Sequence, residues 1–318
     1  MESFREYVKL MRLPNLLLVI SFQWLMYHCV LTPVLAQYTL QPAMPVSDFC
    51  LMLLSSFFIL AGGYVINDYF DMRIDEINRP LTRIVGRTLT KKQAMVFYQI
   101  LTGIGMLFGI LLCVKTLSLT NFLVYVMFLG LLWFYSSSYK RQYVLGNFIV
   151  AFMMGMVPLF IALLELRYMN LIYEPSDDVN FISDLVLGWM GAFGLLAFLW
   201  TFIYEMTQDM FTEKGDRELE CHTFAVVLGF KKTKILIGVC LVVALAVSAY
   251  LLFALSPLEG SWGWRYFVCA ILVTSGYFIY SLVKASTRMD YQFTANLAKA
   301  LFILSMGYAL IVYWEYQL

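Results

Sequence analysis

The sequence predicts an all-α polytopic membrane protein with nine transmembrane helices. Three observations predict this fold class. The 318-residue chain is 61% hydrophobic and 14% charged, far more apolar than a soluble domain. It contains nine apolar stretches long enough to cross a hydrocarbon core of about 30 Å. It also lacks the short alternating segments of a membrane barrel, so helices are the spanning elements that satisfy the backbone within each stretch.

The predicted spans follow one another without an intervening soluble domain, so we expect residues 1–318 to form a single integral membrane domain. The two longest connections, about 69–92 and 208–233, hold most of the polar chemistry. The first apolar run is too long for a cleaved signal, and we interpret it as an uncleaved helix. The nine spans cover roughly residues 14–36, 47–68, 94–114, 120–138, 145–165, 183–207, 234–255, 266–284 and 293–314.

Lysine and arginine are distributed unevenly between the two sides of the predicted bundle. Eighteen of the 22 lie on the side of the N-terminus, and Lys299 lies within the last span. The opposite side holds Lys115, Arg167 and Arg265. By the positive-inside rule, the N-terminus and both long connections are cytoplasmic, and the C-terminus lies on the other side.

An acidic run, NDYFDMRID, follows the second span at residues 67–75. At about 100° per helical residue, Asn67, Asp71 and Asp75 lie on one face as successive i+4 neighbours. Stacked like charges favour a bound cation, and Mg²⁺ is held by a few carboxylates with water and phosphate oxygens completing its shell. The alternative is a solvated helix end whose acids pair with nearby arginines, namely Arg73, Arg79 or Arg83.

A second group of acids follows the sixth span, in the stretch YEMTQDMFTEKGDRELECHT at residues 204–223. Asp209 and Asp216 share a helix face within about 20° if the helix continues, with Thr212 between them. Gly215 leaves this continuation open. Each acid group follows the end of a span, and both span ends lie on the same side of the membrane. The pattern therefore suggests one site between two helical halves.

Several strings resemble signatures of the UbiA superfamily of intramembrane prenyltransferases. NDYFDMRIDEINRP at 67–80 resembles the first aspartate motif, NDxxDxxxD, and QDMFTEKGD at 208–216 resembles the second. MRLPN at 11–15, YSSSYKR at 135–141 and GN at 146–147 also resemble family signatures. Within the superfamily, the chain is most similar to the branch that includes digeranylgeranylglyceryl phosphate synthases.

The sequence departs from that branch at two places. Thr212 stands where the branch has a further aspartate in the second motif. Residues 82–87 read TRIVGR, where the branch has RPIPSG. The first departure concerns the ligands of a second metal ion, and the second concerns the identity of the acceptor.

The resemblance implies nine helices around a central cavity and Mg²⁺-dependent transfer of an isoprenyl group from a prenyl diphosphate to a lipophilic acceptor. It favours a geranylgeranylglyceryl phosphate-like lipid as the acceptor, followed by an aromatic or quinone precursor. The expected partners are these substrates and membrane lipid, with no nucleic acid. The implied catalytic and metal-binding residues are Asn67, Asp71, Asp75, Asp209 and Asp216. The implied substrate-binding residues are Asn15, Asp68, Arg73, Arg79, Tyr139, Lys140, Arg141 and Lys299.

Several of these residues also have a structural interpretation. Lys140 and Arg141 suit positive-inside anchors, and Asn15 suits entry into the first helix. Lys299 suits either a functional role inside the membrane or snorkelling to the interface. Glu205 either pairs with a cation or approaches the metal.

Two other functional classes remain open on sequence alone. A transporter is expected to have acids near the bilayer midplane and spans broken by glycine or proline, whereas the acids here lie at span ends. A catalytically silent family member that binds an isoprenoid lipid is the second alternative, and Thr212 is the argument for it.

Overall fold

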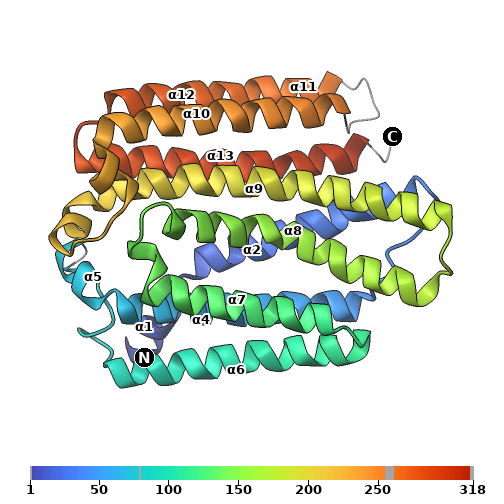
Figure 1. Ribbon diagram of the computed structural model, residues 1–318, viewed down its shortest axis with the longest axis horizontal. Helices are drawn as coiled ribbons and strands as arrows, with labels where there is room; N and C mark the ends of the chain where they lie inside the picture. Colours follow the sequence, from blue (N-terminus) through green and yellow to red (C-terminus); the bar gives the residue numbers. More distant parts are fainter. Residues whose placement is uncertain (1, 79, 255–260, 316–318) are drawn as a thin grey trace. The chain divides into compact units, whose positions relative to one another are not determined.

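The computed structural model describes residues 2–78, 80–254 and 261–315, and this part of the chain is helical with no strand (Figure 1). Within these residues, nine helical segments are long and apolar enough to cross a membrane, which confirms the predicted number of spans. Most extend several residues beyond the predicted limits. Their bounds are Leu13–Ala36, Val46–Phe70, Lys91–Thr116, Leu119–Ser137, Leu145–Ile172, Asp177–Glu218, Phe224–Leu252, Trp262–Lys284 and Arg288–Glu315.

Helical elements follow one another along the chain, and two spans contain a π-helical turn. The first span is built from three elements, and the eighth from another three. In chain order the elements are α1 (Glu2–Leu10), α2 (Leu13–Leu25), η1 (Met26–Leu31), α3 (Thr32–Ala36), α4 (Val46–Phe70), α5 (Met72–Asn78), α6 (Lys91–Thr116), α7 (Leu119–Ser137), η2 (Tyr139–Arg141), α8 (Leu145–Ile172), α9 (Asp177–Glu218), α10 (Phe224–Ala254), α11 (Ser261–Tyr266), η3 (Phe267–Leu272), α12 (Val273–Lys284) and α13 (Arg288–Glu315).

The chain divides into two compact units. The first unit comprises the N-terminal residues up to Gln23, Ala43–Lys140 and Leu164–Ile172. The second comprises Trp24–Pro42, Arg141–Leu163 and the chain from Tyr173 onward. Most of α8 therefore belongs to the second unit and its last turns to the first. The expectations of a single domain and of a central cavity stay predictions.

In the first unit, α4 packs closely against α6. A Cβ atom on Gly105 of α6 would lie 2.9 Å from the backbone nitrogen of Ile59 and 3.1 Å from the carbonyl oxygen of Ser55. The Ser55 hydroxyl donates a hydrogen bond of 2.7 Å to the Gly105 carbonyl oxygen. Glycine is needed here because the two backbones approach too closely for a side chain. This contact fixes the direction of α4, whose last turn carries the first acidic run.

Polar side chains hold the opposite end of α4. The buried Asp48 carboxylate accepts hydrogen bonds of 2.5 Å from Lys115 at the end of α6 and 2.5 Å from the Tyr168 hydroxyl on α8. Glu165, also on α8, is fully buried and accepts hydrogen bonds from two backbone N–H groups just before α4. These contacts satisfy buried charged groups and attach the last turns of α8 to the first unit.

In the second unit, α9 packs against α10 and α13, and α12 packs against α13 (Figure 1). The backbones of α8 and α9 meet at two glycines. A Cβ atom on Gly194 would lie 2.5 Å from the Gly155 carbonyl oxygen, and a Cβ on Gly155 would lie 3.0 Å from the Gly194 carbonyl oxygen. The rings of Phe148 and Phe198 meet edge to face, with centroids 5.5 Å apart, and extend the contact. Glycine at both positions therefore sets the distance between these helices.

We expect the Gly194→Ala variant to lose about 1–3 kcal/mol of folding stability, because the new methyl group would overlap a backbone atom that cannot turn away. The matched control is Gly188→Ala on the same helix, where a Cβ meets nothing within 4 Å. The midpoint of thermal unfolding in detergent measures both. Equal midpoints for the two variants would contradict the close approach of α8 and α9.

Candidate functional site

The first acidic run lies where α4 ends. Helix α4 stops at Phe70, and Asp71 takes a backbone conformation of φ −84° and ψ 2° before α5 begins. The hydrogen bonds from Asp71 N to Asn67 O (2.9 Å) and from Asp75 N to Asp71 O (2.8 Å) continue the i to i−4 pattern across this break. Asn67, Asp71 and Asp75 therefore keep the helical succession that the sequence predicts, even though they lie on two helices.

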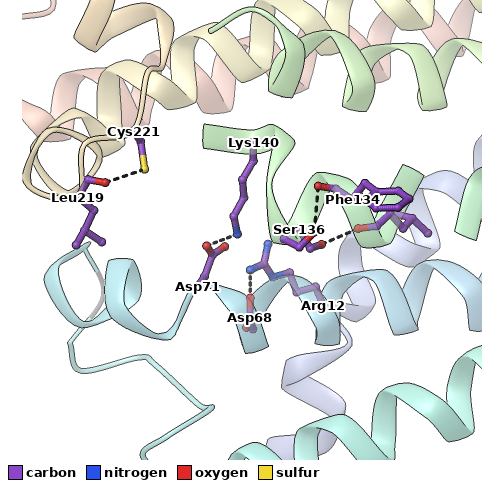
Figure 2. Close-up of polar contacts among 10 residues, drawn as sticks. Arg12, Asp68, Asp71, Phe134, Ser136, Lys140, Leu219 and Cys221 are labelled. Carbon is purple, nitrogen blue, oxygen red and sulfur yellow. Dashed lines mark hydrogen bonds and ion pairs between the residues drawn. The ribbon is translucent and has the colours of Figure 1, made fainter. Parts of the chain in front are cut away.

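Two cations contact this acid cluster within the first unit (Figure 2). The Lys140 ammonium forms an ion pair with Asp71 Oδ1, and both side chains are nearly buried. The Arg12 guanidinium forms an ion pair with Asp68 Oδ1 and lies 5.3 Å from the ring centroid of Tyr64. Burial alone would lower the pKa of Arg12, but the neighbouring Asp68 carboxylate keeps that pKa above its ordinary value. Arg12 therefore stays charged.

The ion pairs of Asp68 and Asp71 can be compared with the alternative in which arginines close in sequence neutralise the acids. Arg83 forms its ion pair with Glu76, at 3.2 Å. Arg73 is exposed, and Arg79 lies outside the described residues. The cations that contact Asp68 and Asp71 come from distant parts of the chain, Arg12 before α2 and Lys140 in η2. Pairing with arginines that are close in sequence therefore does not account for the ion pairs of Asp68 and Asp71.

The second acid cluster lies on α9, which continues through Gly215 to Glu218. The prediction of a loop from residue 208 is therefore wrong for residues 208–218. Continuation puts Asp209 and Asp216 on one face, two turns apart. The helix continues because glycine is tolerated in a helix whose face is held by other contacts.

Donors from three elements surround the second cluster. Asp209 Oδ2 accepts hydrogen bonds from Asn147 Nδ2 on α8 (2.8 Å) and from the backbone N–H of Phe224 at the start of α10 (3.3 Å). Asp216 Oδ2 accepts from the hydroxyls of Thr212 (2.9 Å) and Thr223 (3.4 Å). Both carboxylates are buried. The carboxylates are thus oriented by the second unit's own residues.

The other predicted site residues lie in several different elements. Asn15 lies half-buried in the first turn of α2, and Tyr139 lies half-buried in η2 beside the Phe134 ring. The Arg141 side chain is exposed, and its carbonyl oxygen accepts a hydrogen bond of 2.8 Å from the His222 N–H. Lys299 is half-buried on α13. Their roles as substrate-binding residues stay predictions.

Sequence reasoning did not nominate three residues that contact the acids. They are Arg12, Asn147 and Thr223. Arg12 belongs to the string MRLPN and Asn147 to the string GN, so both strings were available as signals. Thr223 lies outside the strings that resemble family signatures. Its contact with Asp216 depends on the turn between α9 and α10.

The donor chemistry of both clusters fits a hard divalent cation that shares its ligands with a substrate. All the acidic side chains offer oxygen, the ligand atom that Mg²⁺ prefers. Among the described residues, no three His, Cys, Asp or Glu side chains are arranged to hold a metal ion by themselves. An ion held by one or two carboxylates needs water and substrate oxygens to complete its octahedron, and Mg²⁺ binds in this way beside phosphates.

Comparison with known proteins finds a family whose model covers most of the chain. The model of the UbiA prenyltransferase family matches residues 29–307. A digeranylgeranylglyceryl phosphate synthase of Thermococcus sibiricus is 28% identical over 240 residues, which is 74% of each chain.

Two solved structures share the fold. One comes from work on digeranylgeranylglyceryl phosphate synthase in membranes; it has a TM-score of 0.62, 20% identity, and coverage of 98% of this chain and 100% of its own. The other is a UbiA homolog from Archaeoglobus fulgidus bound to GPP and Mg²⁺; it has a TM-score of 0.57, 12% identity, and coverage of 97% and 99%.

Fold and sequence together define an integral multi-pass membrane enzyme with two buried acid clusters. The chain belongs to the UbiA prenyltransferase family, whose model spans most of its length. It is a membrane prenyltransferase.

Proposed function

We propose that the protein transfers an isoprenyl group from a prenyl diphosphate to a lipophilic acceptor in a Mg²⁺-dependent reaction. A geranylgeranylglyceryl phosphate-like lipid is the favoured acceptor, and an aromatic or quinone precursor is the next. The similar protein of Thermococcus sibiricus bears the name of a synthase that makes such a lipid. The structural neighbour from Archaeoglobus fulgidus binds GPP and Mg²⁺. Both support the assignment of substrate class.

The ion pair of Lys140 and Asp71 is the observation that carries the proposal. It places an ammonium group next to a carboxylate in a nearly buried position at the end of α4. A diphosphate with its metal ion presents both signs of charge, so the ammonium group suits phosphate oxygens and the carboxylate suits the metal. A buried charge pair is costly to keep for stability alone, which favours a functional role for it.

In the proposed reaction, the residues of the first unit hold the diphosphate in place. Asn67, Asp71 and Asp75 supply oxygen ligands, and Lys140 donates hydrogen bonds to the diphosphate oxygens. Arg12 neutralises Asp68 and so lowers the negative charge that a diphosphate would meet there. Mg²⁺ bound to these ligands would offset the negative charge that grows on the leaving group.

The bond changes are those of an allylic substitution. The bond between the allylic carbon and the diphosphate oxygen breaks, and the diphosphate leaves with the electron pair. The acceptor's hydroxyl oxygen forms the new bond to that carbon and releases its proton. Lys140 stabilises the leaving diphosphate because its charge is positioned before the bond breaks.

Asp209 and Asp216 would supply further metal ligands for the same reaction. The other substrate-binding candidates are Asn15, Asp68, Arg73, Arg79, Tyr139, Arg141 and Lys299. The distribution of lysine and arginine supports a cytoplasmic N-terminus and a site that faces the cytoplasm.

A metal-removal assay tests the proposal. Purified full-length protein in lipid nanodiscs should convert labelled prenyl diphosphate in the presence of Mg²⁺ and a panel of lipid and aromatic acceptors. We expect chelation with EDTA to abolish the product and added Mg²⁺ to restore it, since the acids alone would repel the diphosphate. Tight binding of diphosphate with no product from any acceptor would instead favour the catalytically silent alternative.

A further inference from the structure

One oxygen of each carboxylate in the second cluster accepts two hydrogen bonds. Asp209 Oδ2 accepts hydrogen bonds from Asn147 and from the Phe224 N–H, and Asp216 Oδ2 accepts from Thr212 and Thr223. The structure gives Asp209 Oδ1 no hydrogen-bond donor among the described residues. Two donors on one oxygen fix the plane of a carboxylate, and in Asp209 they leave Oδ1 for a different partner.

The backbone is strained just before α8, three residues ahead of Asn147. Val144 has φ +67°, in the left-handed region that a β-branched residue rarely adopts. Such a conformation costs about 1–3 kcal/mol and persists where surrounding contacts compensate for it. The Val144 carbonyl oxygen accepts a hydrogen bond of 2.9 Å from Phe148 N, which closes the first turn of α8 around Asn147. The turn therefore sets the position of the amide that reaches Asp209.

Thr212 contributes a donor where the related branch has an acid. Its hydroxyl lies 2.9 Å from Asp216 Oδ2 and 3.1 Å from the Gln208 carbonyl oxygen. One hydroxyl has one proton, and a charged carboxylate is the stronger acceptor, so Asp216 is the favoured partner. An aspartate at 212 would instead stack a third negative charge next to Asp209 and Asp216 on the same helix face.

We propose that Asn147, Thr212 and Thr223 are positioning residues that orient Asp209 and Asp216 toward a divalent cation, so that the second cluster works as a two-carboxylate site. This inference rests on the proposed function. It assigns to Thr212 the task of orienting Asp216, in place of a direct contact with the metal. Threonine at position 212 then no longer argues for a catalytically silent protein, because it replaces a metal ligand by a hydrogen-bond donor to the neighbouring ligand Asp216.

Metal binding to the wild-type protein and its variants tests the inference without using catalysis. Mn²⁺ is titrated into full-length protein in nanodiscs with saturating inorganic diphosphate, and free Mn²⁺ is measured by electron paramagnetic resonance. We expect Asn147→Leu and Thr212→Val to weaken Mn²⁺ binding by about tenfold, as loss of outer-sphere partners does elsewhere. Thr212→Ser keeps the hydroxyl and should bind nearly as the wild type does.

Thr207→Val is the matched control for Thr212→Val. Thr207 lies on the same helix, is fully buried, and donates its hydroxyl to the Ile203 carbonyl oxygen at 2.8 Å without contacting the acids. We expect it to leave Mn²⁺ binding unchanged. Thermal unfolding of every variant identifies any that fail to fold, and Thr212→Ala then replaces Thr212→Val. Wild-type Mn²⁺ affinity in folded Asn147→Leu and Thr212→Val would overturn the inference.

The same samples separate the inference from the proposed function. If the wild-type protein forms prenylated product and the variants bind Mn²⁺ normally, the positioning role is refuted and the proposed function is retained. If the wild-type protein forms no product but Mn²⁺ binding is weakened in both variants, the proposed function is refuted and the oriented metal site is retained. In an active wild type, the Mg²⁺ concentration for half-maximal rate should rise about tenfold in Thr212→Val.

Discussion

Replacing Asp71 by asparagine should lower the rate of prenyl transfer by more than about 100-fold, because loss of an outer-sphere partner alone already costs 10- to 100-fold. Asparagine keeps the size of the side chain and one oxygen, so the change removes charge and little else. The loss should persist at saturating Mg²⁺ and prenyl diphosphate, since the charge is needed as the carbon–oxygen bond breaks. Single-turnover formation of labelled product measures it.

Asp48→Asn is the matched control for this variant. Asp48 lies near the other end of the same helix, α4, is also buried, and is likewise paired with a lysine, Lys115. We expect Asp48→Asn to lower the midpoint of thermal unfolding while leaving the turnover of folded protein near that of the wild type. If both variants lost the same activity at equal folded fractions, the effect would come from disturbance of α4, and Asp71 would have no special role.

Replacing Lys140 by methionine should lower kcat/KM for the prenyl diphosphate by about 10- to 100-fold, which corresponds to one charge-assisted hydrogen bond. The methionine side chain fills similar space and removes the charge that faces Asp71. Steady-state kinetics with varied prenyl diphosphate measure the effect. A larger rise in KM than fall in kcat would indicate that Lys140 binds the diphosphate in the ground state as well as in the transition state.

A double-mutant cycle separates this role from structural pairing. Asp71 and Lys140 touch, so their effects on thermal stability should not add: each single change leaves a nearly buried charge without its partner, and the double change removes both. Lys115→Met, which removes the α6 partner of Asp48, serves as the control lysine. Wild-type kcat/KM in Lys140→Met would contradict the assignment of Lys140 to the diphosphate.

The nine spans and the spacing of the first acid cluster can be read from the amino-acid sequence alone. Spans are readable because a helix must be apolar over its whole membrane crossing, so the signal is local and continuous. Asn67, Asp71 and Asp75 are readable for a similar reason. Their i+4 spacing brings them together through backbone hydrogen bonds that continue even across the helix break at Asp71.

Which residues contact the acids depends on how the helices pack. Lys140 reaches Asp71 across 69 positions of sequence, Asn147 reaches Asp209 across 62, and Arg12 reaches Asp68 across 56. Such partners are chosen by helix packing, including the glycine contact between α8 and α9, and no local period encodes them. The continuation of α9 through Gly215 also depends on packing, because Asn147 and Thr223, which lie outside α9, contact Asp209 and Asp216. Local spacing thus specifies which acids share a face, and packing specifies what orients them.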